Sequence, residues 1–470
     1  MHTKSLLSVS LRVMIISFLL SAVLYCGRVK ADTNVSGIFT SDTTWTKSSS
    51  PYNLTGNILI ESGVTITVEA GATVNFNEHF IRVNGSLIIQ PGVTLDMRTV
   101  VGGGSIQVNG LLTARGTSTN PIHVIGGTYY YAWIAPPTYS SIVFSQSSIP
   151  WNEQTGSGCI IENVVLNSTN ISVNNSPKIA ENKFLDGGGV TVSSGSPEIS
   201  NNNINGRIEI NGGSPTIENN YIEYGQIFYY SDYSGEGEYV TIIGNVVSHA
   251  MGQSSSTAIW LLGSSFGGYA VVEGNLIVNS DIGIDVFNPN TDHIGTSISI
   301  RNNTIINNTV GLSIMDRCTL TITGNNIYDN PTNIRLSQVS TNFDATYNWW
   351  GTTDLQAISQ SIVDFEDDFD LGKVTFVPFL GEPNPEAPDS TYVPTTPPLP
   401  TASPTPTIEP TPETTPTLSP EATTSASPTP SSTPYQEPQL AELEVILGAA
   451  VIVAVIGAGL GLLIYLVKRK

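Results

Sequence analysis

Short segments in the middle of the chain repeat one pattern of apolar and polar positions. In SPEISNNNI at 196–204 and SPTIENNYI at 214–222, an apolar residue lies three positions before an asparagine and another lies two positions after it. These two apolar residues cannot face the same side of an unbroken strand, because side chains alternate between its faces. The pattern therefore predicts a strand, a turn at the asparagine and a second strand. Nine asparagines occupy this position: Asn163, Asn182, Asn202, Asn220, Asn245, Asn275, Asn303, Asn325 and Asn348.

The repeat length predicts how these strands are arranged. Successive asparagines of the set lie between 18 residues apart, as from Asn202 to Asn220, and 30 residues apart, as from Asn245 to Asn275. A period of about 20 residues with short alternating strands is typical of a β-solenoid, in which each coil lies about 4.8 Å above the last. We therefore expect the asparagines to stack as a ladder of hydrogen-bonded amides, with the flanking Ile, Val and Phe side chains as the core.

The N-terminal part continues the pattern, with alternating strands closed by glycine-rich corners. The phrases SGVTITVEAGATVNF at 62–76 and VNGLLTARGTSTNPIHV at 108–124 resemble the opening coils of right-handed parallel β-helix proteins, the pectin-lyase-like superfamily. NWWGT at 348–352 and DFEDDFDLGKVTFVPFL at 364–380 resemble the closing segment of that family. The resemblance covers roughly residues 53–380 and implies an all-β, right-handed parallel β-helix. It implies no single activity, since the family includes lyases, hydrolases, binding proteins and adhesins.

The two ends of the chain predict its topology. Residues 1–31 have the layout of a secretory signal peptide. They have a basic start, an apolar run at 13–24 and small residues before an expected cleavage after Ala31. Residues 445–467 are uncharged and mostly apolar, and as a helix they are long enough to cross a bilayer. Three basic residues, 468–470, follow at once. The positive-inside rule makes them a cytoplasmic tail and predicts a single-pass protein of the cell membrane with an extracellular N-terminal domain.

Between these ends we expect three parts. They are an N-terminal cap segment at 32–52, the β-helix domain at 53–382 and a linker at 383–438. Pro, Thr, Ser and Glu dominate the linker, so it cannot bury enough apolar surface to fold and should act as a disordered stalk. Asn-x-Ser/Thr sequons, of which Asn34 and Asn302 begin two, would make the exposed chain a glycoprotein.

Charge and cysteine content narrow the possible partners. The formal net charge is −21, and residues 32–467 carry 11 basic against 39 acidic residues, a net of −28. No basic stripe is present to neutralise phosphates, so nucleic acid is not an expected partner. Outside the signal peptide only Cys159 and Cys318 remain, and the sequence leaves open whether they are buried free thiols or one disulfide.

One set of outward-facing positions is predicted in the strand after each asparagine turn. Glu209 lies between Ile208 and Ile210, so it faces out where they face in. Mixed aromatic and polar side chains along one face suit the rings and hydroxyls of sugars, and they also suit an ordinary solvated sheet face. The outer column, as we call this set, is Ser172, Thr191, Glu209, Phe228, Trp260, Asp285, Ser313 and Arg335. Its candidate ligand-binding residues are Glu209, Phe228, Trp260, Asp285 and Arg335.

Catalysis on this face would need a pair of neighbouring acid and base groups. Glycosidases use two carboxyl groups about 5–9.5 Å apart. Glu209 and Asp285 are expected three coils apart, roughly 14 Å at the strand spacing. The tripeptide at 290–292, Asn-Thr-Asp, resembles one motif of polygalacturonases, but the paired Asp-Asp, Gly-His-Gly and Arg-x-Lys motifs of that family are missing downstream. We therefore assign no catalytic residue.

Metal sites are equally weakly indicated. A pectate lyase would need clustered carboxylates for Ca²⁺ and a basic residue, roles for which only rough proximity recommends Asp281, Asp285, Asp292 and Arg335. The acidic run at 364–370 could also bind Ca²⁺, or it could decorate the closing segment. The family includes a maturation protein tied to copper insertion, but the histidines here have no metal-ligand spacing; they are His79, His123, His249 and His293. No cofactor is predicted, with Ca²⁺ as the alternative.

Three hypotheses follow for function. The first is a membrane-anchored surface protein whose β-helix binds glycans or envelope components without catalysis. The second is a polysaccharide lyase or glycoside hydrolase of the same fold. The third is a structural spacer of the cell envelope.

Overall fold

The computed structural model describes residues 32–98, 104–129, 138–230, 238–250, 256–263, 268–287, 297–315 and 319–391. The chain divides into two units, Met1–Thr401 and Ala402–Lys470, and every described residue belongs to the first. The predicted signal peptide, transmembrane helix and cytoplasmic tail lie outside the described residues, as do Cys318 and the linker beyond Thr391. No helix in the described part is long and apolar enough to cross a membrane.

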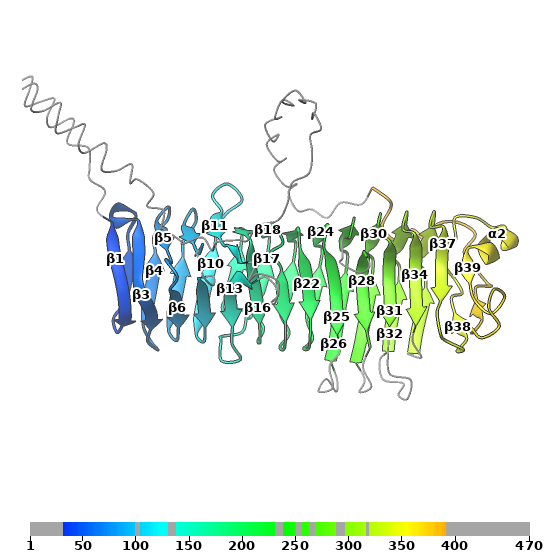
Figure 1. Cartoon of the computed structure of the whole chain (residues 1–470), viewed down its shortest axis with the longest axis horizontal. Helices are drawn as coiled ribbons and strands as arrows, with labels where there is room; N and C mark the ends of the chain where they lie inside the picture. The colour runs from blue at the N-terminus through cyan, green and yellow to red at the C-terminus, as the bar shows by residue number, and fades with distance from the viewer. Residues whose placement is uncertain are drawn as a thin grey trace, which may run out of the picture. The chain divides into compact units, whose positions relative to one another are not determined.

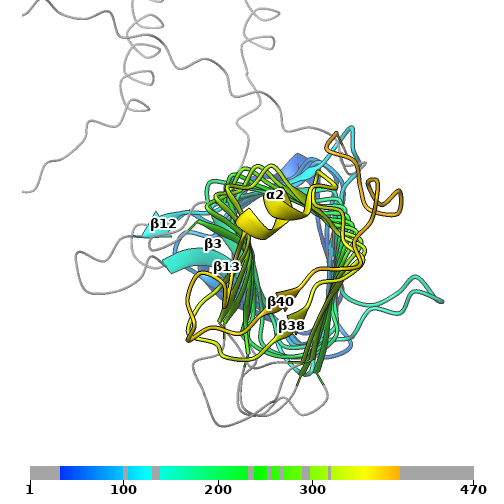
Figure 2. The ribbon, with the colours of Figure 1, turned by 90° about the vertical axis from the view of Figure 1, so that its right-hand side faces the viewer.

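The described chain winds into a stack of coils whose strands lie side by side in parallel (Figure 1). Each coil crosses three faces in turn, and Figure 2 shows the coils superposed around one axis. The prediction of an all-β fold of stacked parallel strands is confirmed. The 12 strands of the first face are β2 (Thr43–Trp45), β4 (Thr65–Val68), β7 (Ser86–Ile89), β10 (Leu111–Arg115), β14 (Ile160–Glu162), β17 (Lys178–Ala180), β20 (Glu198–Ser200), β23 (Thr216–Glu218), β26 (Glu238–Ile243), β29 (Gly268–Glu273), β32 (Ser297–Arg301) and β35 (Thr319–Thr323), counted over the described residues.

The second and third faces are joined in one large sheet. The second face consists of β5 (Thr73–Asn75), β8 (Thr94–Asp96), β11 (Ile122–Ile125), β15 (Val164–Asn167), β18 (Lys183–Leu185), β21 (Asn203–Ile204), β24 (Tyr221–Glu223), β27 (Val246–Ser248), β30 (Leu276–Val278), β33 (Thr304–Ile306) and β36 (Asn326–Tyr328). The third consists of β6 (Phe80–Val83), β9 (Ser105–Val108), β13 (Thr138–Phe144), β16 (Thr169–Val173), β19 (Val190–Val192), β22 (Arg207–Ile210), β25 (Gln226–Tyr230), β28 (Thr257–Leu262), β31 (Ile282–Phe287), β34 (Val310–Met315), β37 (Thr332–Leu336) and β39 (Ile362–Val363).

The remaining elements lie at the ends and one edge of the stack. At the start, β1 (Thr33–Phe39) and β3 (Tyr52–Ile60) each run across the second and third faces. The others are η1 (Lys47–Ser49), β12 (Thr128–Tyr129), β38 (Phe343–Asp344), α2 (Leu355–Gln360) and β40 (Val374–Thr375). Because β1 pairs with β3 and β2 pairs with β4, residues 32–52, the predicted N-terminal cap segment, form the first coil of the stack.

The core follows from strand parity. On β22, Ile208 and Ile210 are fully buried while Glu209 between them is half-buried on the outside. The same inward positions carry mostly Ile, Val, Leu or Phe in coil after coil, with Tyr229 in line with Ile210, so these side chains form one continuous core along the axis. Such stacking suits β-branched residues, which pack well on pleated surfaces.

Asparagines hold the corner between the first and second faces. From Asn182 to Asn348, each side-chain nitrogen donates to the side-chain oxygen of the next asparagine at 2.9–3.0 Å. The same oxygen also accepts the backbone N–H of the asparagine in the neighbouring coil, as Asn275 Oδ1 does from Asn245. All eight side chains are buried, so the ladder satisfies polar groups that would otherwise be costly inside the stack.

Asn163 lies outside this ladder, and its assignment to it was wrong. Ile161 pairs with Ile179 and Val165 pairs with Lys183, so Val164 occupies the ladder position of its coil. The backbone N–H of Val164 donates to Asn182 Oδ1, while Asn163 itself takes a left-handed conformation with φ of 53°. Asparagine tolerates that conformation, and the residue before the ladder position adopts it in other coils too.

The C-terminal segment 383–391, which we call the strap, is part of the folded stack. It was predicted to belong to the linker, but Asn384 donates its backbone N–H to Asn326 Oδ1 at 2.7 Å and its side-chain amide to Asn302 Oδ1 at 3.0 Å. The Thr304 hydroxyl donates to the carbonyl of Pro388. The strap therefore lies on the outside of the second face, over β33 and β36, where the described chain ends in orange in Figure 1.

Candidate functional site

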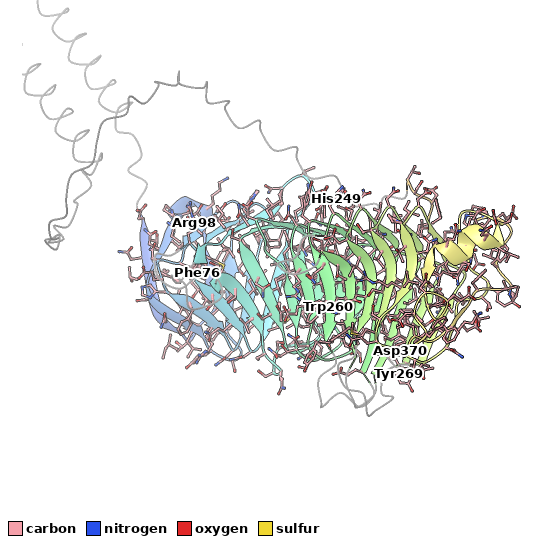
Figure 3. The ribbon with its side chains drawn as sticks, turned by 45° about the vertical axis from the view of Figure 1, so that its right-hand side comes forward. Phe76, Arg98, His249, Trp260, Tyr269 and Asp370 are labelled. Atoms are coloured by element: carbon pink, nitrogen blue, oxygen red, sulfur yellow. The ribbon has the colours of Figure 1, made fainter. Side chains whose placement is uncertain are left out.

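The eight residues of the outer column lie in single file on the third face. Strand pairing places Ser172 beside Thr191, then Glu209, Phe228, Trp260, Asp285, Ser313 and Arg335 in order. Because a short strand of the second face intervenes, the column lies on the second strand after each asparagine turn, not on the strand directly after it. Trp260 is near the middle of the stack (Figure 3).

Two aromatic rings form the centre of the column. Phe228 and Trp260 pack edge to face, with ring centroids 5.1 Å apart. The Arg207 guanidinium lies over the Phe228 ring at 4.4 Å and forms an ion pair with Glu209 at 3.5 Å. The aromatic pair is thus bordered on one side by the Arg207 guanidinium, whose charge Glu209 already neutralises. Because Arg207 covers one face of the Phe228 ring, the edge of that ring is more accessible than this face.

Trp260 also carries an unused hydrogen-bond donor. Its ring is half-buried, and Nε1 is buried without a hydrogen-bond partner within the described part of the chain. Arg335 Nε has the same status at the other end of the site. An unpaired buried donor is costly, so a ligand acceptor that reached either group would recover that cost.

Asp285, Ser313 and Arg335 form a short polar series next to Trp260. Burial raises the pKa of Asp285, and the hydrogen bond from Ser313 and the charge of Arg335 oppose that rise. Arg335 Nη2 lies 3.5 Å from Ser313 Oγ, so the hydroxyl group lies between the carboxyl group of Asp285 and the guanidinium group of Arg335. The series can offer a ligand both hydrogen-bond donors and acceptors.

The carboxyl groups of the column are far apart. Glu209 and Asp285 are separated by Phe228 and Trp260, which makes three strand spacings, or roughly 14 Å. This is wider than the separation that either retaining or inverting glycosidases use. Asp292 and His293 lie outside the described residues.

No group of three or more possible metal ligands is found among the described residues. In the acidic run, Asp364 is buried and accepts backbone N–H groups of Val374 and Glu366, at 2.8 and 2.9 Å. Glu366 pairs with Lys373 at 2.8 Å. These two carboxylates therefore hold the closing loop together.

Sequence reasoning missed two features. The first is Arg207, whose contact with Phe228 crosses from one strand to the next. The second is a short further ladder on the other side of the second face, in which Asn308 donates to Asn330 Oδ1 at 3.2 Å and Asn330 donates to Asn333 Oδ1 at 3.0 Å. Both Asn308 and Asn330 follow a main-ladder asparagine by five positions, a spacing that the sequence displays.

Cys159 is a buried free thiol, one of the two alternatives that the sequence left open. Its sulfur lies 3.5 Å from the backbone nitrogen of Leu112 and 3.4 Å from the carbonyl of Gly110. Burial raises the pKa of this thiol, which keeps it protonated and unreactive.

The chain matches no protein-family model, and no curated protein or solved structure is significantly similar to it.

Proposed function

We propose that this chain is a cell-surface protein of the right-handed β-helix type whose third face binds glycans without cleaving them. The proposal includes secretion by residues 1–31 and anchoring by the helix at 445–467. The observation that carries it is the Phe228–Trp260 pair, an aromatic centre on an outward face with polar groups on both sides. Sugars present flat apolar faces and rings of hydroxyls, and this arrangement complements both.

Charge favours neutral or basic sugars over acidic ones. The segment between the signal peptide and the cytoplasmic tail has a net charge of −28, which repels polyanions. Within the site, Arg207 is paired with Glu209, and Arg335 acts on Asp285 through its charge. Little positive charge is therefore left to hold a polyuronate.

A polysaccharide lyase or hydrolase is the second candidate, and one observation favours it. The raised pKa of Asp285, close to Arg335, is the kind of perturbation found at catalytic acids. Against it stands the spacing of Glu209 and Asp285, which leaves Asp285 without a carboxyl partner in the column. A spacer without a ligand is the third candidate.

A glycan array with the purified full chain tests the proposal. Trp260→Ala should weaken binding of the selected glycan about thirtyfold, since loss of one aromatic anchor often costs about 2 kcal/mol. Ser172→Ala lies on the same face four strands away and should bind as wild type. If the wild-type chain binds no glycan, the proposal fails and the spacer remains. If Trp260→Ala binds like wild type, the site has been misplaced.

A further inference from the structure

Two tyrosines stand exposed side by side on the first face. Tyr239 on β26 and Tyr269 on β29 are direct strand partners, 49% and 53% exposed, with ring centroids 6.2 Å apart and ring planes 31° from parallel. Neither belongs to the outer column, which lies on the third face. Large apolar rings are rarely left so exposed in adjacent coils without a partner that covers them.

The sheet around these rings is regular, and two of its strands carry many hydroxyl groups. Strands β26, β29, β32 and β35 pair residue for residue without a bulge. On the neighbouring strands β32 and β35, the first two outward positions of each strand carry small hydroxyl side chains. They are Ser297, Ser299, Thr319 and Thr321. A regular surface that combines exposed rings with hydroxyl groups favours a ligand that is itself extended and hydroxylated.

The charged groups beside the tyrosines are engaged within the protein, and Glu238, next to Tyr239, accepts the backbone N–H of Gly213 at 2.8 Å. Glu273 and Arg301 are strand partners, and their side chains form an ion pair at 2.7 Å. The pair offers hydrogen bonds without a net charge. A polyuronate would find no free cation on strands β26, β29, β32 and β35, because Arg301 is already paired with Glu273.

We propose that Tyr239 and Tyr269 form a second glycan-binding surface, specific for a neutral polysaccharide in packed, insoluble form. The two rings would lie against the flat faces of sugars exposed at the surface of such a material, while the Ser and Thr hydroxyls bond its edges. The rings of the outer column are half-buried, so that surface suits a single polysaccharide molecule that can reach between the side chains. The two surfaces are therefore distinct in face, exposure and preferred ligand, and neither depends on the other.

Depletion of the purified full chain by microcrystalline cellulose and by chitin powder tests this surface. Wild type should partition onto at least one powder, and Tyr239→Ala/Tyr269→Ala should lower the partition constant at least tenfold. Tyr239→Phe/Tyr269→Phe keeps the rings and should bind as wild type. Tyr347→Ala removes a tyrosine that is 57% exposed elsewhere and should also bind as wild type. Because both rings are exposed, the unfolding midpoint of the double alanine variant should match that of wild type.

Three results would overturn the inference. They are no depletion of wild type by either powder, undiminished depletion of the double alanine variant, and an equal loss in Tyr347→Ala. Trp260→Ala separates this surface from the outer column, since it should lose soluble glycan and keep the powder. Loss of powder binding in Trp260→Ala alone, with the double alanine variant unaffected, would assign the powder to the outer column instead.

Discussion

Asparagine carries most of the polar order inside this stack. In the main ladder each amide before Asn348 is bonded to the coils on both sides, so removal of one such side chain leaves groups of two neighbours without partners. The ladder is uninterrupted from Asn182 to Asn348 although the coils between vary in length. Extra residues in a coil are therefore confined to its loops, while the corner stays fixed.

Replacing Asn245 or Asn275 with Leu tests the ladder. Each change orphans buried donors and acceptors, at about 1–3 kcal/mol per group, so the unfolding midpoint in urea should fall clearly. Asn163→Gly and Ser172→Ala are the controls, the first because glycine fits the left-handed backbone at 163 and the second because its side chain faces outward. A midpoint unchanged in both ladder variants would contradict the hydrogen-bonded ladder.

Asp285 should make stability depend on pH in a direction that the raised pKa fixes. The folded chain holds this proton more tightly than the unfolded chain does, so the stabilising effect of protonation is complete below the ordinary pKa of 3.8 and is lost as pH rises through the folded pKa. Asp285→Asn should therefore unfold at a higher temperature than wild type at pH 7 and at nearly the same temperature at pH 3. Exposed Asp281→Asn serves as the control. A lower midpoint for Asp285→Asn at pH 7 would mean that attraction to Arg335 outweighs burial.

At the scale of strands and turns, parity made most of the fold predictable. Offsets of three and two residues around Asn202 or Asn220 fix a turn and two inward faces, and the same argument places Trp260 and Asp285 on one outward face. The parity argument failed at Asn163 because asparagine is accepted both at the ladder position and at the left-handed position directly before it, and Asn163 occupies the second. Parity could not predict the contact of Arg207 with Phe228, because a contact between neighbouring coils depends on side-chain direction as well as on register.

The strap shows a different limit of the sequence. Composition alone assigns residues 383–391 to the linker, since they contain prolines and few apolar residues. What binds them is a set of hydrogen bonds from Asn384 to residues 58 and 82 positions away, which no local pattern reveals. Long-range polar contacts of single residues are the part of this fold that the sequence hides.

Asn384→Ala should loosen the strap without unfolding the coils. The change removes the side-chain bonds to Asn302 and to the carbonyl of Gly324, worth about 1–3 kcal/mol, so strap amides should exchange with deuterium roughly tenfold faster or more. Ser390→Ala, at a strap position outside this hydrogen-bond set, is the control. Exchange as slow as in wild type would show that Asn384 does not fasten the strap.

At the scale of the whole molecule, the strap fixes the position of the last described residue. Thr391 follows a segment bonded to β33 and β36, so the described chain ends on the second face and not at the end closed by β38 and β40. The third face, with the outer column, is a separate side of the coils. A tether that continues from Thr391 therefore starts away from both proposed glycan surfaces.

Protease applied to intact cells tests the predicted orientation. Cleavage should release a stable fragment that ends within 392–438, since the strap protects residues 383–391. Mass spectrometry of the released fragment locates the cut. A fragment that appears only after lysis would reverse the orientation, and a cut inside the strap would contradict its packing.

The claim that the outer column binds glycan without cleaving it is tested most directly by product analysis. The full chain is incubated with the glycan that it binds, and reducing ends and unsaturated products are measured over time beside Asp285→Asn and Arg335→Ala. We predict that wild type releases neither product above the rate without protein. Release by wild type that either substitution abolishes would contradict the account and identify the chain as an enzyme.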